Sequence, residues 1–244
     1  MITNSFLNLA FLILLSLSVI HCRFLPDEEG DDGIAPAPPE GLCSAVTIHG
    51  FKCKEYHVKT DDGYILGVQR IPEGRTGPGD GSQPRLPVLL QHGVIVDGMN
   101  WLMTSPEQAL AMMLADNGYD VWISNHRGTR FSRRHVSLDP MHPEFWNWTW
   151  VDLANQDLPA VIGLVFKETG QQMHYVGHSM GTLVALVLLS EGKLENVKSA
   201  ALLCPIAYLS HVTSPVALAG AKFFIGEVSN FFFSFFFNFK YLSF

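Results

Sequence analysis

The sequence predicts an α/β protein with a mostly parallel sheet and helices on both faces. Short apolar runs typical of buried strands, such as residues 87–91 and 120–124, alternate with longer segments whose apolar residues recur at helical spacing. Strands that alternate with helices favour right-handed crossovers between parallel strands. The chain has 244 residues, 48% of them apolar, which is enough for one domain with a sizeable core.

The charge distribution argues against a nucleic-acid partner. The formal net charge is -7, and the only local group of cations is formed by four arginines: Arg127, Arg130, Arg133 and Arg134. Phosphate backbones bind to a concentrated cationic face, which this composition does not offer. A neutral or apolar ligand fits the sequence better.

The N-terminal residues are predicted to be a targeting signal rather than part of the fold. The segment Phe6–Ile20 is apolar, short for a membrane span and typical of a secretory signal, so residues 1–22 are predicted to be cleaved. An uncleaved anchor is the alternative. Residues 23–41 are acidic and Pro-rich, which predicts an unstructured linker. We expect the mature chain in the secretory pathway, outside the cell or in a vacuole or lysosome, without a transmembrane span.

The cysteines fit an oxidising compartment. Cys43 and Cys53 flank a short loop and are the predicted disulfide pair, with two free surface thiols as the alternative. Cys204 lies in an apolar run and is predicted to be a small buried side chain. No two cysteines have the short spacing of a zinc site, so we expect no structural metal.

Residues 42–204 form the predicted core of the domain, and its first elements are strands. Residues 55–60 and 64–70 are predicted to pair as a hairpin through the tight turn Asp61-Asp62-Gly63. A long exposed loop at residues 72–86 separates this hairpin from the buried strand at residues 87–91.

A helix is predicted to begin at Ser105, which would cap it. Pro106 would occupy the first helical position, and Gln108 stands where a capping box places a glutamine. The predicted helix ends at Asn117-Gly118, where glycine permits a left-handed stop. The strand at residues 120–124 follows.

The second half of the core repeats this alternation. A helix is predicted over residues 152–169, with Gly170 as its stop and an inward face formed by Val161, Ile162, Leu164 and Val165. An apolar strand then enters an apolar helical run, Leu183–Ser190, through the sequence Gly-His-Ser-Met-Gly. Residues 197–204 are predicted to be one further buried strand.

The turn Gly177-His178-Ser179-Met180-Gly181 is predicted to be a nucleophile elbow. A sharp strand-to-helix turn raises the Ser179 hydroxyl above the sheet, and glycine is needed at positions 177 and 181 because neighbouring backbone comes close. The N-terminus of the following helix favours an anion. A structural turn that happens to contain a serine is the alternative.

The segment His92-Gly93-Val94 directly follows the strand at residues 87–91 and is predicted to be the oxyanion loop. In this architecture one donor is a backbone N–H of that loop and the other belongs to the residue after the nucleophile. These donors are assigned to Val94 and Met180. A His-Gly pair that only turns the chain is the alternative.

Two other histidines and one asparagine each have more than one plausible role. His178 adjoins Ser179 but is expected to point away from it, with a packing or hydrogen-bonding role. His126 is expected either to line the mouth of the pocket or to be a satisfied loop histidine. Asn147 begins a glycosylation sequon, although Trp146, Trp148 and Trp150 around it look like packing residues.

Together these motifs resemble the acid lipase family of α/β-hydrolases, which includes gastric and lysosomal lipases and plant triacylglycerol lipases. The resemblance covers residues 42 to about 227 and rests on five stretches: residues 60–66, 90–93, 121–128, 157–160 and 177–181. It implies hydrolysis of neutral lipid esters, such as triacylglycerols, through an acyl-enzyme on Ser179 at a lipid–water interface, without a cofactor. It also implies a helical cap, whose beginning is expected at residues 205–227.

The triad base and acid of this family are not found after Ser179. The later acids are glutamates, Glu191, Glu195 and Glu227, and the later histidine is His211. We therefore expect a hydrolase core that is incomplete at its C-terminus, without its last strands and with little or no activity.

The Phe-rich residues 228–244 do not resemble the family. They are interpreted as an aberrant tail, which we attribute to read-through into an unspliced intron at Val228, since valine codons begin with GT. Two alternatives remain for the function: a non-catalytic fragment that binds lipid or a partner, and another serine hydrolase of this fold, such as a steryl esterase.

Overall fold

The computed structural model describes residues 41–77 and 84–207. Their centre is a seven-stranded mixed sheet in the order β1-β2-β4-β3-β6-β7, with β5 paired to β2 beside this path. The strands are β1 (Lys54–Lys59), β2 (Tyr64–Ile71), β3 (Pro87–Gln91), β4 (Asp120–Ser124), β5 (Arg134–His135), β6 (Met173–His178) and β7 (Val197–Leu203).

The strand pairing follows the alternation seen in the sequence. β1 and β2 form the predicted antiparallel hairpin, and β2 pairs antiparallel with β4. β3 pairs in parallel with both β4 and β6, and β6 pairs in parallel with β7. The carboxyl ends of β3, β4 and β6 therefore meet at one edge of the sheet, which is where ligands bind in open α/β sheets.

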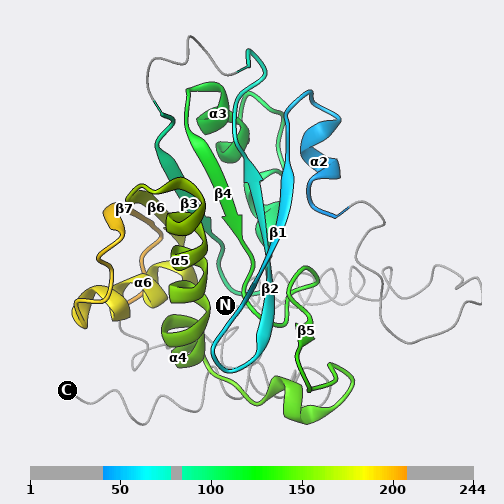
Figure 1. The fold of residues 1–244 in the computed structure, drawn as a ribbon, viewed down its shortest axis with the longest axis vertical. Coiled ribbons are helices and arrows are strands. Elements are labelled where there is room, and N and C mark those ends of the chain that lie inside the picture. Colours follow the sequence, from blue (N-terminus) through cyan, green and yellow to red (C-terminus); the bar gives the residue numbers. More distant parts are fainter. Residues whose placement is uncertain (1–40, 78–83, 208–244) are drawn as a thin grey trace, which may run out of the picture. The chain divides into compact units, whose positions relative to one another are not determined.

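Helices cover both faces of this sheet, so the predicted α/β architecture is confirmed (Figure 1). One core packs under α4 (Trp150–Asp152), α5 (Leu158–Thr169) and α6 (Met180–Ser190). The other core packs under α2 (Ser44–Thr47), the 3-10 helix η1 (Gly98–Trp101) and α3 (Leu110–Asp116). A second 3-10 helix, η2, spans Pro143–Trp146. Among the described helices, none combines the length and the apolarity needed to cross a bilayer.

The predicted helix start at Ser105 is wrong. The Ser105 carbonyl accepts the amides of Gln108 and Ala109, both at 2.8 Å, and closes a separate turn. Ala109 then has an extended conformation with φ -72° and ψ 114°, so α3 begins only at Leu110. The predicted stop is correct, because α3 ends at Asp116 and Gly118 has a φ of 90°.

The helix predicted over residues 152–169 is in fact three consecutive helical segments. It begins earlier, at Trp150, where Thr149 and Asp152 form a capping box. A π-helical segment, η3 (Leu153–Asp157), then precedes α5, which ends as predicted at Gly170 with a φ of 67°. π-Helical turns of this kind occur often at functional sites.

The strand at residues 197–203 exists, but the prediction that it is buried is wrong. β7 is the outermost strand of the described sheet and pairs only with β6, so most of its side chains are exposed. Cys204, which directly follows it, is an exposed free thiol rather than a buried side chain. The apolar composition of this strand therefore does not reflect burial by the described residues.

Candidate functional site

Ser179 lies in the turn between β6 and α6 in a conformation that few non-glycine residues adopt. Its φ is 52° and its ψ is -113°. The turn is fixed on both sides, because the Ser179 amide donates to the Leu203 carbonyl at 3.0 Å and the Ser179 carbonyl accepts the amide and the hydroxyl of Thr182. Such strained residues cost about 1–3 kcal/mol and gather at active sites.

The two glycines that flank Ser179 are required by close backbone contacts. A Cβ on Gly181 would lie 2.5 Å from the carbonyl oxygen of Gln91, and a Cβ on Gly177 would lie 2.7 Å from that of Gly181. Both distances are far below van der Waals contact. The sharp turn thus brings β6 and α6 too close together for side chains at either position.

The segment His92-Gly93-Val94 lies directly beside the Ser179 turn. A Cβ on Gly93 would be 3.0 Å from the Cβ of Ser179, so this glycine also allows a close approach. The loop begins at the carboxyl end of β3, whose neighbour β6 ends at the turn. The structure therefore brings the predicted nucleophile and the predicted oxyanion loop together.

The imidazole of His92 is a buried, neutral link between two loops. Its Nε2 accepts the backbone N–H of His126 at 3.1 Å, which assigns the proton to Nδ1, and Nδ1–H donates to the Gly93 carbonyl at 2.7 Å. Burial, with a contribution from the nearby His126, lowers the pKa of His92 to about 3. His92 is therefore a poor candidate for a general base near neutral pH.

His126 and His178 are packed against this region. The ring of His126 is 2% exposed, lies edge-on to His92 with centroids 4.9 Å apart, and has neither nitrogen hydrogen-bonded within the described residues. Its Nδ1 lies 3.8 Å from the Asp157 carboxylate, so His126 is a buried loop histidine beside a carboxylate rather than a residue at a pocket mouth. The ring of His178 packs edge-on against Trp101 at 6.4 Å, in agreement with a packing role.

An ionic network that sequence analysis did not predict is centred on the buried Arg127, the residue directly after His126. Arg127 is 1% exposed, and its Nε–H and backbone N–H donate to the carboxylate of Asp157 at 2.7 and 2.9 Å. Its terminal nitrogens donate to Asp62 at 2.6 and 3.0 Å, and its guanidinium lies 3.9 Å from the ring centroid of Tyr64. Burial would raise the pKa of Asp62, but hydrogen bonds from Arg127 and Thr60 lower it below the usual range.

The network explains three of the sequence stretches that support the family resemblance. Asp62 comes from the β1–β2 turn, Arg127 from the loop after β4, and Asp157 from the end of η3. These three stretches are far apart in the sequence and meet at one guanidinium group. In the sequence, Asp62, Arg127 and Asp157 have one feature in common: each is a charged residue within an otherwise apolar motif.

No described residue is placed to activate the serine. Within residues 41–77 and 84–207, the Ser179 hydroxyl makes no hydrogen bond. Glu191 and Glu195 are exposed beyond the end of α6, and Glu191 pairs with Lys193 at 2.6 Å. His211 and Glu227 lie outside the described residues, as do the predicted signal peptide and the Phe-rich tail.

The remaining predicted features lie away from this turn. Cys43 and Cys53 form a disulfide with a Cα–Cα distance of 5.3 Å. Asn147 is exposed, whereas Trp148 and Trp150 beside it are buried in the core. Among the described residues, histidine, cysteine and acidic side chains form no cluster suited to a metal ion. Residues 23–40 of the predicted linker at 23–41, and nearly all of the expected cap at 205–227, lie outside the described residues.

Comparisons with known proteins agree with the observed fold. Residues 87–240 match the model of the alpha/beta hydrolase fold, and residues 44–105 match that of the partial alpha/beta-hydrolase lipase region. Triacylglycerol lipase 2 of Arabidopsis thaliana is 51% identical over 81% of this chain and 49% of its own length.

Animal lipases are similar over the same region. Gastric triacylglycerol lipase of Rattus norvegicus is 40% identical over 75% of this chain and 48% of its own length. Human lysosomal acid lipase/cholesteryl ester hydrolase is 38% identical over 79% of this chain and 50% of its own length. The chain thus spans about half the length of the curated relatives it matches. It belongs to the α/β-hydrolase fold family, and within that family to the acid lipases.

Proposed function

We propose that this chain is the nucleophile-bearing part of a serine ester hydrolase that acts on neutral lipid esters such as triacylglycerols. The observation that carries this proposal is Ser179 at a φ of 52°, held between close backbone contacts at the carboxyl end of β6. Its hydroxyl oxygen attacks the ester carbonyl, the alcohol leaves, and water then releases the fatty acid from the acyl-enzyme. The steps require only protein groups and water.

The oxyanion donors in this proposal are the backbone N–H groups of Val94 and Met180. Gly93 and Val94 share one planar trans peptide, in which the carbonyl and the N–H point in opposite directions. Because His92 Nδ1–H holds the Gly93 carbonyl, it also sets the direction of the Val94 N–H. Met180 is the first residue of α6, so its N–H lies among the free amides of the helix N-terminus. Removing one such donor typically costs about 10²–10³ in kcat.

A lipid substrate is supported by the surface beside the oxyanion loop and by the names of the relatives. Ile95 and Val96 directly follow this loop, and both are exposed, Ile95 by 73%. Apolar side chains that remain exposed next to a reactive site suit contact with a lipid surface. The matched relatives are named as triacylglycerol lipases and as a cholesteryl ester hydrolase, so steryl esters are the second substrate class. We place the enzyme in the secretory pathway.

We further propose that this chain alone hydrolyses esters weakly or not at all. The described residues give the Ser179 hydroxyl no histidine to take its proton. Loss of a triad member typically leaves only about 10³–10⁴-fold catalysis over water, from the oxyanion hole and from binding. The alternative role for the chain is that of a fragment that binds lipid or a partner.

A fluorescent phosphonate probe tests the state of the nucleophile in the full chain. An activated serine reacts covalently with the probe, so the rate of labelling reports activation, and Ser179→Ala identifies the labelled site. We expect slow labelling that requires Ser179. Rapid labelling would contradict the proposed inactivity, and equal labelling of Ser179→Ala would contradict the assignment of the nucleophile.

Hydrolysis of triolein, a short-chain ester and a cholesteryl ester separates the substrate classes. The assay is run on the chain alone and on a version extended with the C-terminal half of Arabidopsis triacylglycerol lipase 2. We expect triolein hydrolysis by the extended protein only. Hydrolysis of short-chain esters without triolein would overturn the lipid assignment.

A further inference from the structure

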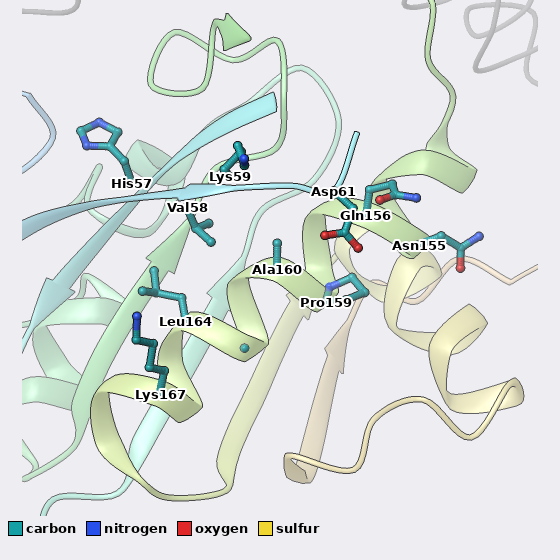
Figure 2. A pocket seen from close by; sticks show the side chains of 11 residues that line it. His57, Val58, Lys59, Asp61, Asn155, Gln156, Pro159, Ala160, Leu164 and Lys167 are labelled. Atoms are coloured by element: carbon teal, nitrogen blue, oxygen red, sulfur yellow. The ribbon is translucent and has the colours of Figure 1, made fainter. Parts of the chain in front are cut away.

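A pocket of about 460 Å³ lies between the outer strand β1 and the helix α5, and none of its lining residues belongs to the Ser179 turn (Figure 2). Its size is within the usual range for ligand sites. The β1 side is formed by His57, Val58, Lys59 and Asp61. The helical side is formed by Asn155, Gln156, Pro159, Ala160, Gly163, Leu164 and Lys167.

The free edge of β1 forms one wall of this pocket. Within the described sheet, β1 pairs only with β2. The N–H of Thr60 donates toward β2, to the Tyr64 carbonyl at 2.9 Å. Because successive residues of a strand direct their backbone groups to opposite sides, Lys59 and His57 present their N–H and carbonyl groups outward. Both residues line the pocket, where these groups can pair with another extended chain.

The middle of the opposite wall is apolar, whereas Asn155, Gln156 and Lys167 make its two ends polar. Val58 is directed from β1 toward α5, where Ala160 and Leu164 face it across the pocket (Figure 2). Apart from its chain neighbours and the backbone of its own helix, nothing lies within 4 Å of a Cβ built on Gly163, so the helix surface is open at this point. A strand edge opposite an apolar helix face is a geometry that accepts an extended peptide as an added strand.

Charged side chains at the two ends of the pocket give it a direction. Asp61 lies at the end near Gln156 and Pro159, and Lys167 lies at the opposite end, beyond Leu164 (Figure 2). β1 runs from the Lys167 end toward the Asp61 end. A peptide antiparallel to β1 therefore places its N-terminal end beside Asp61 and its C-terminal end beside Lys167, which matches both charges.

We infer that this pocket binds an extended peptide segment of a partner protein, antiparallel to β1. The segment carries a basic group at its N-terminal end, small or β-branched side chains in the middle and an acidic group at its C-terminal end. α5 extends about 12 Å from Pro159 to Lys167, which corresponds to about four extended residues. This binding is independent of the proposed ester hydrolysis, since the two sites share no residue.

Two capped peptides of identical composition test the inference: Arg-Val-Thr-Val-Glu and its reverse, Glu-Val-Thr-Val-Arg. Each is titrated into the full chain while backbone amide shifts and hydrogen exchange are followed by NMR. We expect the first peptide to bind at least about tenfold more tightly than the second, since charges of the correct sign face it at both ends. We also expect slower exchange of the His57 and Lys59 amides.

Three variants define the site. Lys167→Glu is expected to abolish the preference for the first peptide, whereas Lys198→Glu, the same charge change on the exposed strand β7, keeps it. Gly163→Leu is expected to weaken binding of both peptides because it fills the open helix surface. Equal affinities for the unmodified chain, protection at amides outside β1, or equal effects of Lys167→Glu and Lys198→Glu would overturn the inference. None of these measurements depends on Ser179.

Discussion

Ser179 is held by contacts that leave no room for side chains around it. Gly177, Gly181 and Gly93 each approach a neighbouring segment more closely than a Cβ permits. These contacts hold Ser179 in its strained conformation and place the loop His92-Gly93-Val94 beside it. Because a single added Cβ atom would clash at each of these glycines, substitution by alanine is the most direct test of their role.

Gly181→Ala is the first such test. The added Cβ would lie 2.5 Å from the Gln91 carbonyl oxygen and 3.0 Å from that of His92, both of them backbone atoms. We expect a loss of about 1–3 kcal/mol in the free energy of unfolding, measured in urea, because β3 and α6 must separate. Gly163→Ala is the control, since its Cβ meets open space in a helix and should stabilise by up to about 1 kcal/mol. Equal unfolding midpoints for the two variants would contradict the role of Gly181.

His92 predicts a pH dependence of stability. Its pKa is about 3 in the folded protein, because of burial, and about 6.5 in the unfolded chain. Between these values the unfolded chain binds more protons, so the folded state is destabilised as the pH falls from about 6.5 toward 3. We expect His92→Gln to lose less stability than the unmodified chain between pH 7.5 and 4.5, by an amount on the order of 2 kcal/mol. Parallel pH profiles of the two proteins would contradict this expectation.

The sequence alone predicted the residues that a local motif contains. The Gly-x-Ser-x-Gly spacing identified the turn, and the His-Gly pair identified the loop beside it, because both are contiguous and their neighbours in sequence are their neighbours in space. The network at Arg127 could not be predicted in this way, since its partners Asp62 and Asp157 are 65 and 30 residues away. Only the tertiary fold brings these charges together.

At the scale of elements, strands and helix ends were predicted better than helix starts. β3 and β4 have the predicted bounds, and Gly118 and Gly170 end helices because each adopts a positive φ. Ser105 failed as a cap because its backbone carbonyl closes a turn of its own, which no side-chain pattern reveals. The exposure of β7 was not predicted, because the apolar sequence of a strand does not show whether a neighbouring element covers it.

The two helix starts can be compared by matched substitutions. Thr149→Ala removes the hydroxyl that accepts the Val151 amide at 3.2 Å in the capping box of α4. We expect a cost of about 1 kcal/mol in urea unfolding, using protein from a host that does not glycosylate Asn147. Ser105→Ala is the control, with an expected cost of about 0.5 kcal/mol or less, because Ser105 caps no helix. A larger loss in the free energy of unfolding for Ser105→Ala would instead support the prediction that Ser105 caps this helix.

At the scale of the whole molecule, Arg127 joins the β1–β2 turn, the loop after β4 and η3. The same loop holds His126, whose N–H binds the His92 ring, and His92 in turn binds the Gly93 carbonyl. A continuous path of contacts thus connects Asp62, at the turn of the hairpin, with the loop His92-Gly93-Val94 beside Ser179. The stability of the domain and the geometry of the site therefore depend on the same buried charge.

Arg127→Met tests this dependence, because it leaves the carboxylate of Asp157, which is 2% exposed, without its buried cation. We expect a loss of about 3–5 kcal/mol in the free energy of unfolding at pH 7, as for other buried pairs that lose one partner. Arg75→Met is the matched control, since Arg75 pairs with Asp116 and Glu107 at the surface and should cost at most about 1 kcal/mol.

The difference between Arg127→Met and the unmodified chain should also depend on pH. The pKa of Asp62 is lower in the folded state than in the unfolded chain, where it is about 4. The ionised carboxylate therefore contributes fully to the free energy of unfolding above about pH 4, and this contribution is lost as the pH falls through the folded-state pKa. The stability gap measured at pH 7 should therefore begin to shrink as the pH falls below about 4, and the part due to Asp62 is lost once the pH is below its lowered folded-state pKa. A gap that stays constant down to this range would show that Arg127 acts by packing on Tyr64 rather than by its charge.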